Sequence, residues 1–103
     1  MNLVGIQILG RFCIEHGDVR EQVKAWIAEV RSADWRAPKD IKEEYSSAGF
    51  VVENQVYFNS KGKRYRLQVK ISYGLQIVKI VWIGTHAEYT KRMKRGQGGR
   101  QGH

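Results

Sequence analysis

The sequence predicts an α+β fold in which a helical hairpin packs on one face of a mainly antiparallel sheet. The main observation is a change of period. Apolar residues recur mostly at helical spacing before Gly49 and follow the two-residue period of strands after it. The second observation is size, because 103 residues with 42% hydrophobic content can bury one core without disulfide bonds. We therefore expect a single compact domain.

The N-terminal segment is expected to contain a strand and then a short helix. Residues 3–9 form an apolar run typical of a strand, with Gly5 as a bulge or a point of close approach. A helix over residues 11–16 follows, and Gly17 ends it. This helix is the first arm of the predicted hairpin.

The second arm of the hairpin has the clearest helical pattern. Asp18 and Glu21 resemble a capping box. The apolar residues of this arm share one helical face: Val19, Val23, Trp26, Ile27 and Val30. Pro38 suits the first turn of another short helix, which is expected to end near Tyr45.

The second half of the chain is expected to form a meander of strands. The predicted strands are 50–52, 56–58, 64–73 and 77–83, with turns at 59–63 and 74–75. In the strand 64–73 apolar and polar residues alternate strictly, so one face should be core and the other a basic platform open to water. The strand 77–83 is nearly all apolar, as expected of a strand covered on both sides. A short C-terminal helix is expected to begin after it.

Charge is divided unevenly along the chain. Residues 1–53 carry seven Lys/Arg and nine Asp/Glu, whereas residues 54–103 carry eleven Lys/Arg and one acid, Glu88. Such a field favours a polyanion, most simply nucleic acid, although an acidic protein would be drawn to the same surface. We expect the domain to span residues 1–91. Residues 92–103 should form a basic, glycine-rich flexible tail, either a solubilising terminus or a phosphate-binding arm.

We expect the protein to be cytoplasmic and not bound to a membrane. The only cysteine, Cys13, cannot pair within the chain and lies in an apolar segment, which suggests a buried structural thiol in a reducing compartment. No apolar run approaches the roughly 20 residues of a membrane span, and the N-terminus lacks the pattern of a signal peptide.

Neither a metal nor another cofactor is expected. The chain has no P-loop, dinucleotide fingerprint, CxxC pair, HExxH motif or nucleophile elbow. Its histidines, His16, His86 and His103, lie far apart in sequence and lack clustered acidic neighbours.

The residue types of the second half suit cleavage of RNA by its own 2′-hydroxyl. That reaction needs a group that takes a proton, a group that gives one, and cations near the phosphoryl oxygens. His86 is the natural acid or base, because histidine titrates at about pH 6.5 when unperturbed. Tyr89 would share its face if residues 86–91 are helical. Arg64 and Arg66 could clamp phosphate, and Lys63, Lys70 and Lys91 could add charge.

At these residues the chain resembles a known family. Asn59, followed by KGKRYRLQVKISYGLQIVKIVWIGTHAEYTK, is similar to the HigB branch of the RelE-like toxins, and the likeness covers roughly residues 1–91. The resemblance implies a compact α+β toxin that cuts messenger RNA without a metal, commonly on the translating ribosome, until a HigA-type antitoxin neutralises it. It implies catalytic roles for Arg66, His86 and Tyr89. The residues implied in RNA or phosphate binding are Lys63, Arg64, Lys70 and Lys91, with Asn59 ordering the turn.

Two other functions remain open at this point. The related ParE-like toxins inhibit DNA gyrase and cleave no RNA. A non-catalytic RNA- or ribosome-binding module is the other alternative, in which Trp35 or Trp82 simply holds RNA. Single residues also have structural alternatives, since Tyr65 falls on the apolar face and Thr85 could cap the turn that begins at His86.

Overall fold

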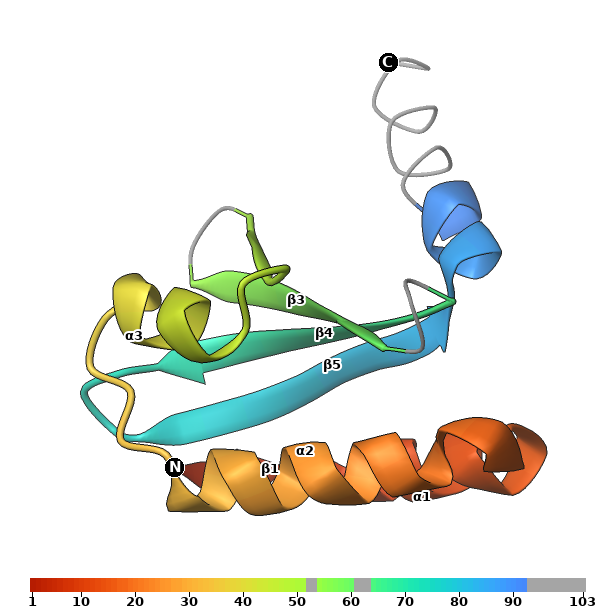
Figure 1. The fold of residues 1–103 in the computed structure, drawn as a ribbon, viewed down its shortest axis with the longest axis horizontal. Helices are drawn as coiled ribbons and strands as arrows, with labels where there is room; N and C mark the ends of the chain where they lie inside the picture. The colour runs from red at the N-terminus through yellow and green to blue at the C-terminus, as the bar shows by residue number, and fades with distance from the viewer. Residues whose placement is uncertain (52–53, 61–63, 93–103) are drawn as a thin grey trace, which may run out of the picture.

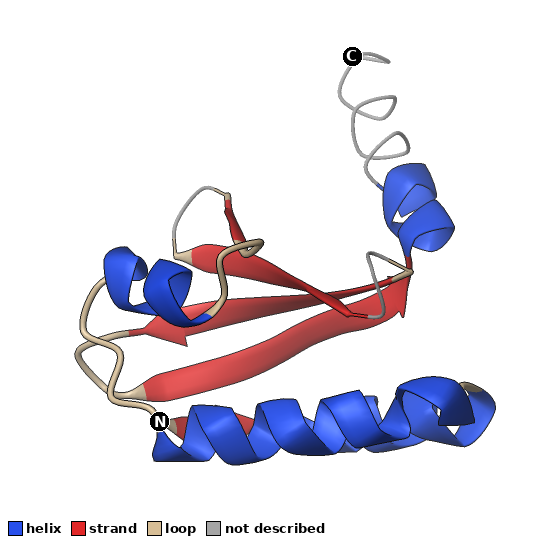
Figure 2. Ribbon diagram, in the orientation of Figure 1, coloured by secondary structure: helices blue, strands red, loops and turns tan. Residues whose placement is uncertain are grey.

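The computed structural model describes residues 1–51, 54–60 and 64–92 (Figures 1 and 2). The elements are β1 (Asn2–Val4), α1 (Ile6–Glu15), α2 (Arg20–Ser32), α3 (Pro38–Glu44), β2 (Gly49–Phe50), β3 (Gln55–Ser60), β4 (Tyr65–Ser72) and β5 (Ile77–Thr85). A 3₁₀ turn, Gly17–Val19, joins α1 to α2. Residues 86–92 are helical. The predicted α+β class is confirmed, and no described helix is both long and apolar enough to cross a membrane.

The five strands form one sheet in the order β1-β5-β4-β3-β2. β1 pairs with β5 in parallel, and the other neighbouring strands pair antiparallel. The predicted meander is therefore confirmed, with β1 added beside its last strand. This order places β4 at the centre of the sheet, between β3 and β5.

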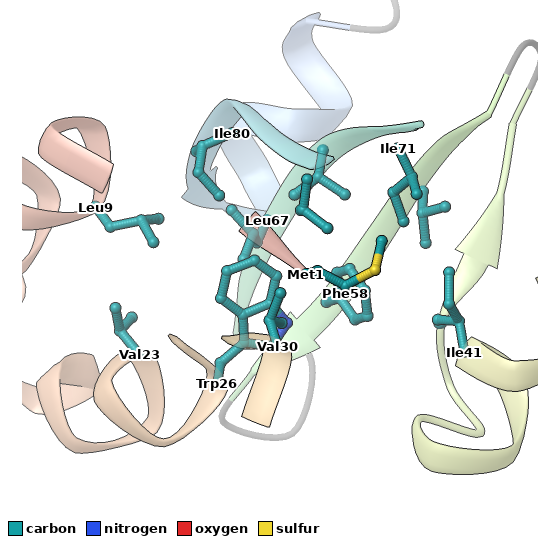
Figure 3. Close-up of a cluster of buried hydrophobic side chains, with 14 of the residues drawn as sticks. Met1, Leu9, Val23, Trp26, Val30, Ile41, Phe58, Leu67, Ile71 and Ile80 are labelled. Carbon is teal, nitrogen blue, oxygen red and sulfur yellow. The ribbon is translucent and has the colours of Figure 1, made fainter. Parts of the chain in front are cut away.

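The hydrophobic core lies between the helices and one face of the sheet. Alternate residues of β4 are buried, namely Tyr65, Leu67, Val69 and Ile71. Leu9 of α1, Trp26 of α2 and Ile41 of α3 belong to the same core (Figure 3). Side chains of a strand alternate between two faces, so the buried residues of β4 all lie on one face of the sheet. Because α1, α2 and α3 pack in the same core, all three helices cover that face. The opposite face of β4 carries Arg66, Gln68 and Lys70.

The N-terminal segment differs from the predicted strand over residues 3–9. The strand ends at Val4, and α1 begins at Ile6 rather than at residue 11. The buried residues of α1, Leu9 and Cys13, lie four positions apart, as on one face of a helix. A short apolar run does not distinguish a strand from a helix by itself, which explains the error. Burial raises the pKa of the Cys13 thiol, in agreement with a structural role.

Gly5 marks the change from strand to helix. Its φ angle is 90°, a left-handed conformation that glycine adopts without strain. A methyl group at this position would lie 3.2 Å from the carbonyl oxygen of Ile80 in β5. The predicted close approach at Gly5 is confirmed, and it allows α1 to turn back over the sheet.

The capping box predicted for Asp18 and Glu21 is absent. Asp18 lies in the 3₁₀ turn, and α2 begins without a side-chain cap. The hydroxyl of Tyr65 lies 2.9 Å from both carboxylate oxygens of Asp18 and donates to them. This hydrogen bond raises the pKa of Tyr65, so the hydroxyl stays a donor. Asp18 thus joins the helical hairpin to the start of β4.

A bulge in β5 explains its long apolar run. Trp82 pairs with Gln68 and Ile80 pairs with Val69, so Val81 is an extra residue in the ladder. Before the bulge the even-numbered residues of β5 therefore face the core, and after it the odd-numbered residues do. The expectation that β5 is covered on both sides is wrong, since Val81 is 37% exposed. The bulge also places Trp82 on the face opposite the helices.

Candidate active site

The candidate site lies on the open face of the sheet, near the start of β4 and the end of β5. Arg66 of β4 is directly opposite Asn59 in β3 and Gly84 in β5. Residues directly opposite on neighbouring strands share one face, and the core residues of β4 lie on the other. The helical residues 86–92 continue from the tip of β5, away from α1 and α2 (Figure 1).

The Arg66 guanidinium is held by an amide and two aromatic rings. Its Nε donates to Asn59 Oδ1 at 3.1 Å, and Asn59 Nδ2 donates to the carbonyl oxygen of Ser47 at 3.2 Å. Its central carbon lies 4.2 Å from the centre of the Tyr57 ring and 4.4 Å from that of Tyr89. Within the described ranges its terminal nitrogens donate to no protein acceptor.

A capping box fixes the helical turn that carries Tyr89. Thr85 N donates to Glu88 Oε1 at 2.8 Å, and Glu88 N donates to Thr85 Oγ1 at 3.1 Å. The expected capping role of Thr85 is confirmed. The centre of the Tyr89 ring lies 6.0 Å from that of Tyr57 and 6.0 Å from that of Trp82. The cap thus brings Tyr89 back over the sheet, beside Arg66.

The Glu88 cap should make the stability of the wild type depend on pH. The hydrogen bond from the backbone of Thr85 lowers the pKa of Glu88 below its ordinary value of 4.5. A lowered pKa in the folded state means that the stabilisation is present above the unfolded value and is lost as the pH falls through the folded one. We expect Glu88→Gln to lower the free energy of unfolding at pH 7 by roughly 0.5–1 kcal/mol. Denaturant titrations should show this difference shrinking below pH 4.5. An equal difference at pH 7 and pH 3 would contradict the assignment.

Two glycines make room for aromatic rings on the open face. A methyl group on Gly49 would lie 1.9 Å from Cζ of Tyr57, and one on Gly84 would lie 2.5 Å from Cζ2 of Trp82. Real side-chain atoms never approach so closely, so these rings lie directly over the glycines. The rings flank Arg66 from the two neighbouring strands.

The predicted cations are not gathered into one cluster. Arg64 Nη1 lies 3.5 Å from Asp18 Oδ2 in an exposed ion pair, so Arg64 points toward the hairpin and not toward Arg66. Lys70 is exposed on the same strand, about 13 Å from Arg66 at 3.3 Å per residue. Lys91 is exposed on the terminal helical segment. Lys63 lies outside the described residues.

His86 begins the helical segment 86–92, as the sequence predicted. Its backbone nitrogen donates to the carbonyl oxygen of Arg64 at 3.0 Å, which ties the segment to β4. Its side chain is exposed and donates to no described residue. His86 and Tyr89 are three residues apart in a helix and thus lie on one side of it. Among the described residues, no three His, Cys, Asp or Glu side chains are placed to hold a metal ion.

Sequence reasoning missed two residues of this surface and misassigned another. Tyr57 was overlooked, although it lies on the same face of β3 as the polar residues Gln55 and Asn59, two positions away on either side. Arg92, whose guanidinium carbon lies 5.2 Å from the centre of the Trp82 ring, was assigned to the tail. Asn59 was expected to order the turn, whereas its amide contacts Arg66 and Ser47. Cross-strand pairing was the signal that could have found Tyr57 and the role of Asn59.

Comparison with known proteins assigns the chain to a family. A family model described as HigB toxin, RelE-like toxic component of a toxin–antitoxin system, matches residues 19–92. No curated protein matches the chain. The matched region contains α2, α3, β2 to β5 and the described residues of the candidate site. Because the match covers well over half of the sequence, the chain belongs to the HigB family of RelE-like toxins, the toxic components of toxin–antitoxin systems.

Proposed function

We propose that this toxin is a metal-independent endoribonuclease that cuts messenger RNA during translation on the ribosome. The observation that carries the proposal is the environment of Arg66. Its guanidinium is fixed by Asn59 and two tyrosine rings, while its terminal nitrogens have no described protein acceptor. A cation preorganised in this way suits a phosphoryl oxygen whose negative charge grows during the reaction.

In the proposed reaction the RNA supplies its own nucleophile. The 2′-oxygen forms a bond to the adjacent phosphorus, and the bond from phosphorus to the 5′-oxygen breaks. One side chain takes the proton of the 2′-hydroxyl and another gives a proton to the leaving 5′-oxygen. The products are a 2′,3′-cyclic phosphate and a 5′-hydroxyl. We assign the two proton transfers to His86 and Tyr89, and the phosphoryl oxygens to Arg66.

The remaining basic residues are proposed to hold the RNA strand. Lys70 on β4 and Lys91 on the terminal helical segment are exposed, and Arg64 forms an exposed ion pair with Asp18. Exposed ion pairs contribute little free energy, so RNA phosphates can compete for Arg64. We expect Lys63, beside Arg64 in the sequence, to act with it.

As the toxic component of a toxin–antitoxin system, the protein has an antitoxin as its partner. We expect this antitoxin to be of the HigA type. It should neutralise the toxin by placing an acidic or hydrophobic segment over the face that carries Arg66, or by displacing the helical residues 86–92. Binding of the RNA and the ribosome places the proposed action in the cytoplasm.

The proposal is tested by adding the purified toxin to a translating cell-free extract and mapping new RNA ends on one message. The toxin is first dialysed against a chelator, which is removed before the assay. We expect cuts within the reading frame whose 5′ ends carry a hydroxyl and are ligated only after treatment with a kinase. A transcript with 2′-deoxyribose at a cut position should resist cleavage there.

Two other outcomes would contradict the proposal. Loss of DNA supercoiling by gyrase, without new RNA ends, would indicate a ParE-like activity. Slower translation without new ends and without an effect on gyrase would indicate a non-catalytic ribosome- or RNA-binding module.

A further inference from the structure

An open hollow lies beside the Arg66 site, over the end of β5. It has a volume of about 390 Å³ and is lined by Trp82, Glu88, Lys91 and Arg92. A methyl group on Gly84 would lie 2.5 Å from the Trp82 ring and 3.1 Å from Glu88 Oε1, so the ring and the carboxylate are neighbours above this glycine. The hollow thus combines an aromatic surface, an acceptor and two cations.

Trp82 differs from the other tryptophans of the chain in its exposure. Trp26 and Trp35 are only 7% and 2% exposed, and both belong to the hydrophobic core, whereas Trp82 is partly exposed on the open face. Burial therefore accounts for two of the three tryptophans. Burial does not account for Trp82, whose ring lies beside Tyr89 and Arg92.

The neighbours of Trp82 continue the row that begins at Arg66. The Tyr89 ring lies between them, 4.4 Å from the guanidinium of Arg66 and 6.0 Å from the centre of the Trp82 ring. Arg92 covers the Trp82 ring at 5.2 Å, and this arginine is itself exposed. Aromatic rings interleaved with cations on an open sheet face are typical of surfaces that bind single-stranded RNA, where rings stack on bases and cations contact phosphates.

Glu88 favours a base over a phosphate in the hollow. Its carboxylate is negatively charged at neutral pH, since its pKa lies below 4.5, and it would repel a phosphate placed against Trp82. A nucleobase is neutral and carries N–H groups that a carboxylate can accept. Oε1 of Glu88 accepts the hydrogen bond from the Thr85 backbone. Among the described residues no donor to Oε2 is found, so a base could donate to that oxygen.

From this geometry we infer that Trp82 is a stacking subsite for a nucleobase of single-stranded RNA, next to the phosphate held by Arg66. A base stacks on the ring in place of Arg92, and the displaced guanidinium contacts a phosphate of the same strand. The inference rests on the proposed RNA substrate but not on its cleavage.

Tryptophan fluorescence tests the subsite directly, because Trp82 is the one tryptophan that RNA can reach. The probe is a single-stranded heptamer with 2′-O-methyl groups throughout, which binds but cannot supply a 2′-hydroxyl nucleophile. We expect it to quench the fluorescence of the wild-type protein, and a duplex of the same length to quench far less. In Trp82→Phe the quenching should disappear while the affinity, measured by anisotropy of a labelled heptamer, changes less than about threefold. In Trp82→Leu the affinity should fall roughly 5- to 150-fold, the range for loss of one stacked base.

Several results would overturn the inference. These are absence of binding to the wild type, binding without quenching, or equal affinity of the wild type and Trp82→Leu. If Trp82→Leu does not fold, unchanged quenching in Trp82→Phe would still refute it. Failure of the nuclease proposal can be distinguished from failure of the subsite. Quenching by the heptamer without cuts in messenger RNA leaves the subsite intact, and cuts without quenching refute the subsite alone.

Discussion

Replacing Arg66 with alanine is expected to lower RNA cleavage by about 100- to 1000-fold, the cost of losing one preorganised group that stabilises developing charge. The same change should lower the free energy of unfolding by only about 1–2 kcal/mol. The side chain lies on the face opposite the core, and the contacts with described residues that it loses are one hydrogen bond to Asn59 and two contacts with tyrosine rings. Single-turnover cleavage and denaturant unfolding measure the two effects separately.

The matched control is a variant that removes another positive charge from the face that carries Arg66. Lys79 is exposed on β5. It lies opposite Lys70 of β4 in the sheet and makes no contact with Arg66. Lys79→Ala should keep cleavage within about threefold of the wild type, because it removes one screened surface charge. Arg66→Lys should fall between the wild type and alanine, since it keeps the charge but loses the planar fork. If Arg66→Ala lost folding and cleavage in parallel, its role would be structural.

The sequence predicted best those elements whose pattern is local and repeated. α2 has its buried residues, Val23, Trp26 and Val30, at helical spacing over three turns. In β4 strict alternation predicted both the buried face and the position of Arg66 on the opposite face, where Arg66 is half-buried. Such patterns depend only on which residues are apolar and on one period, so they can be recognised without knowledge of tertiary contacts.

The errors arose where distant segments decide the structure. Residues 6–9 are apolar in either a strand or a helix, and the close approach of Gly5 to Ile80 determines which one forms. In β5 the extra residue Val81 is defined only by pairing with β4. The run of apolar residues therefore did not show that the core-facing positions change from even to odd numbers. Both features depend on contacts across more than ten residues of sequence.

The candidate site shows the same division. Sequence spacing placed Arg66, His86 and Tyr89 near the end of the sheet, and the helical turn expected after Thr85 is present. It could not place Arg64, because its ion pair with Asp18 joins residues 46 positions apart. The contact of Tyr57 with Arg66 was likewise hidden, since it depends on the register of β3 with β4.

Replacing His86 with alanine is expected to lower cleavage by about 100- to 10,000-fold, the usual effect of removing a general acid or base. The free energy of unfolding should change by less than about 0.5 kcal/mol, because the side chain is exposed and alanine keeps the backbone hydrogen bond to Arg64. The measurement is single-turnover cleavage of one message in the translating extract, with stability taken from denaturant unfolding. Thr90→Ala is the control, since it removes an exposed side chain of the same helical segment whose hydroxyl, among the described residues, donates to the His86 carbonyl oxygen.

Tyr89 lies at the other end of the same helical turn, and Tyr89→Phe separates proton transfer by its hydroxyl from the contacts of its ring. Phenylalanine keeps the ring that contacts Arg66 and Trp82 but lacks the hydroxyl. If Tyr89 carries a proton, Tyr89→Phe should lose cleavage by a factor similar to that of His86→Ala. Full activity of Tyr89→Phe together with an inactive Tyr89→Ala would limit Tyr89 to positioning Arg66. Full activity of His86→Ala would remove His86 from the chemistry and move the catalytic assignment to Tyr89 for proton transfer and Arg66 for the phosphoryl oxygens.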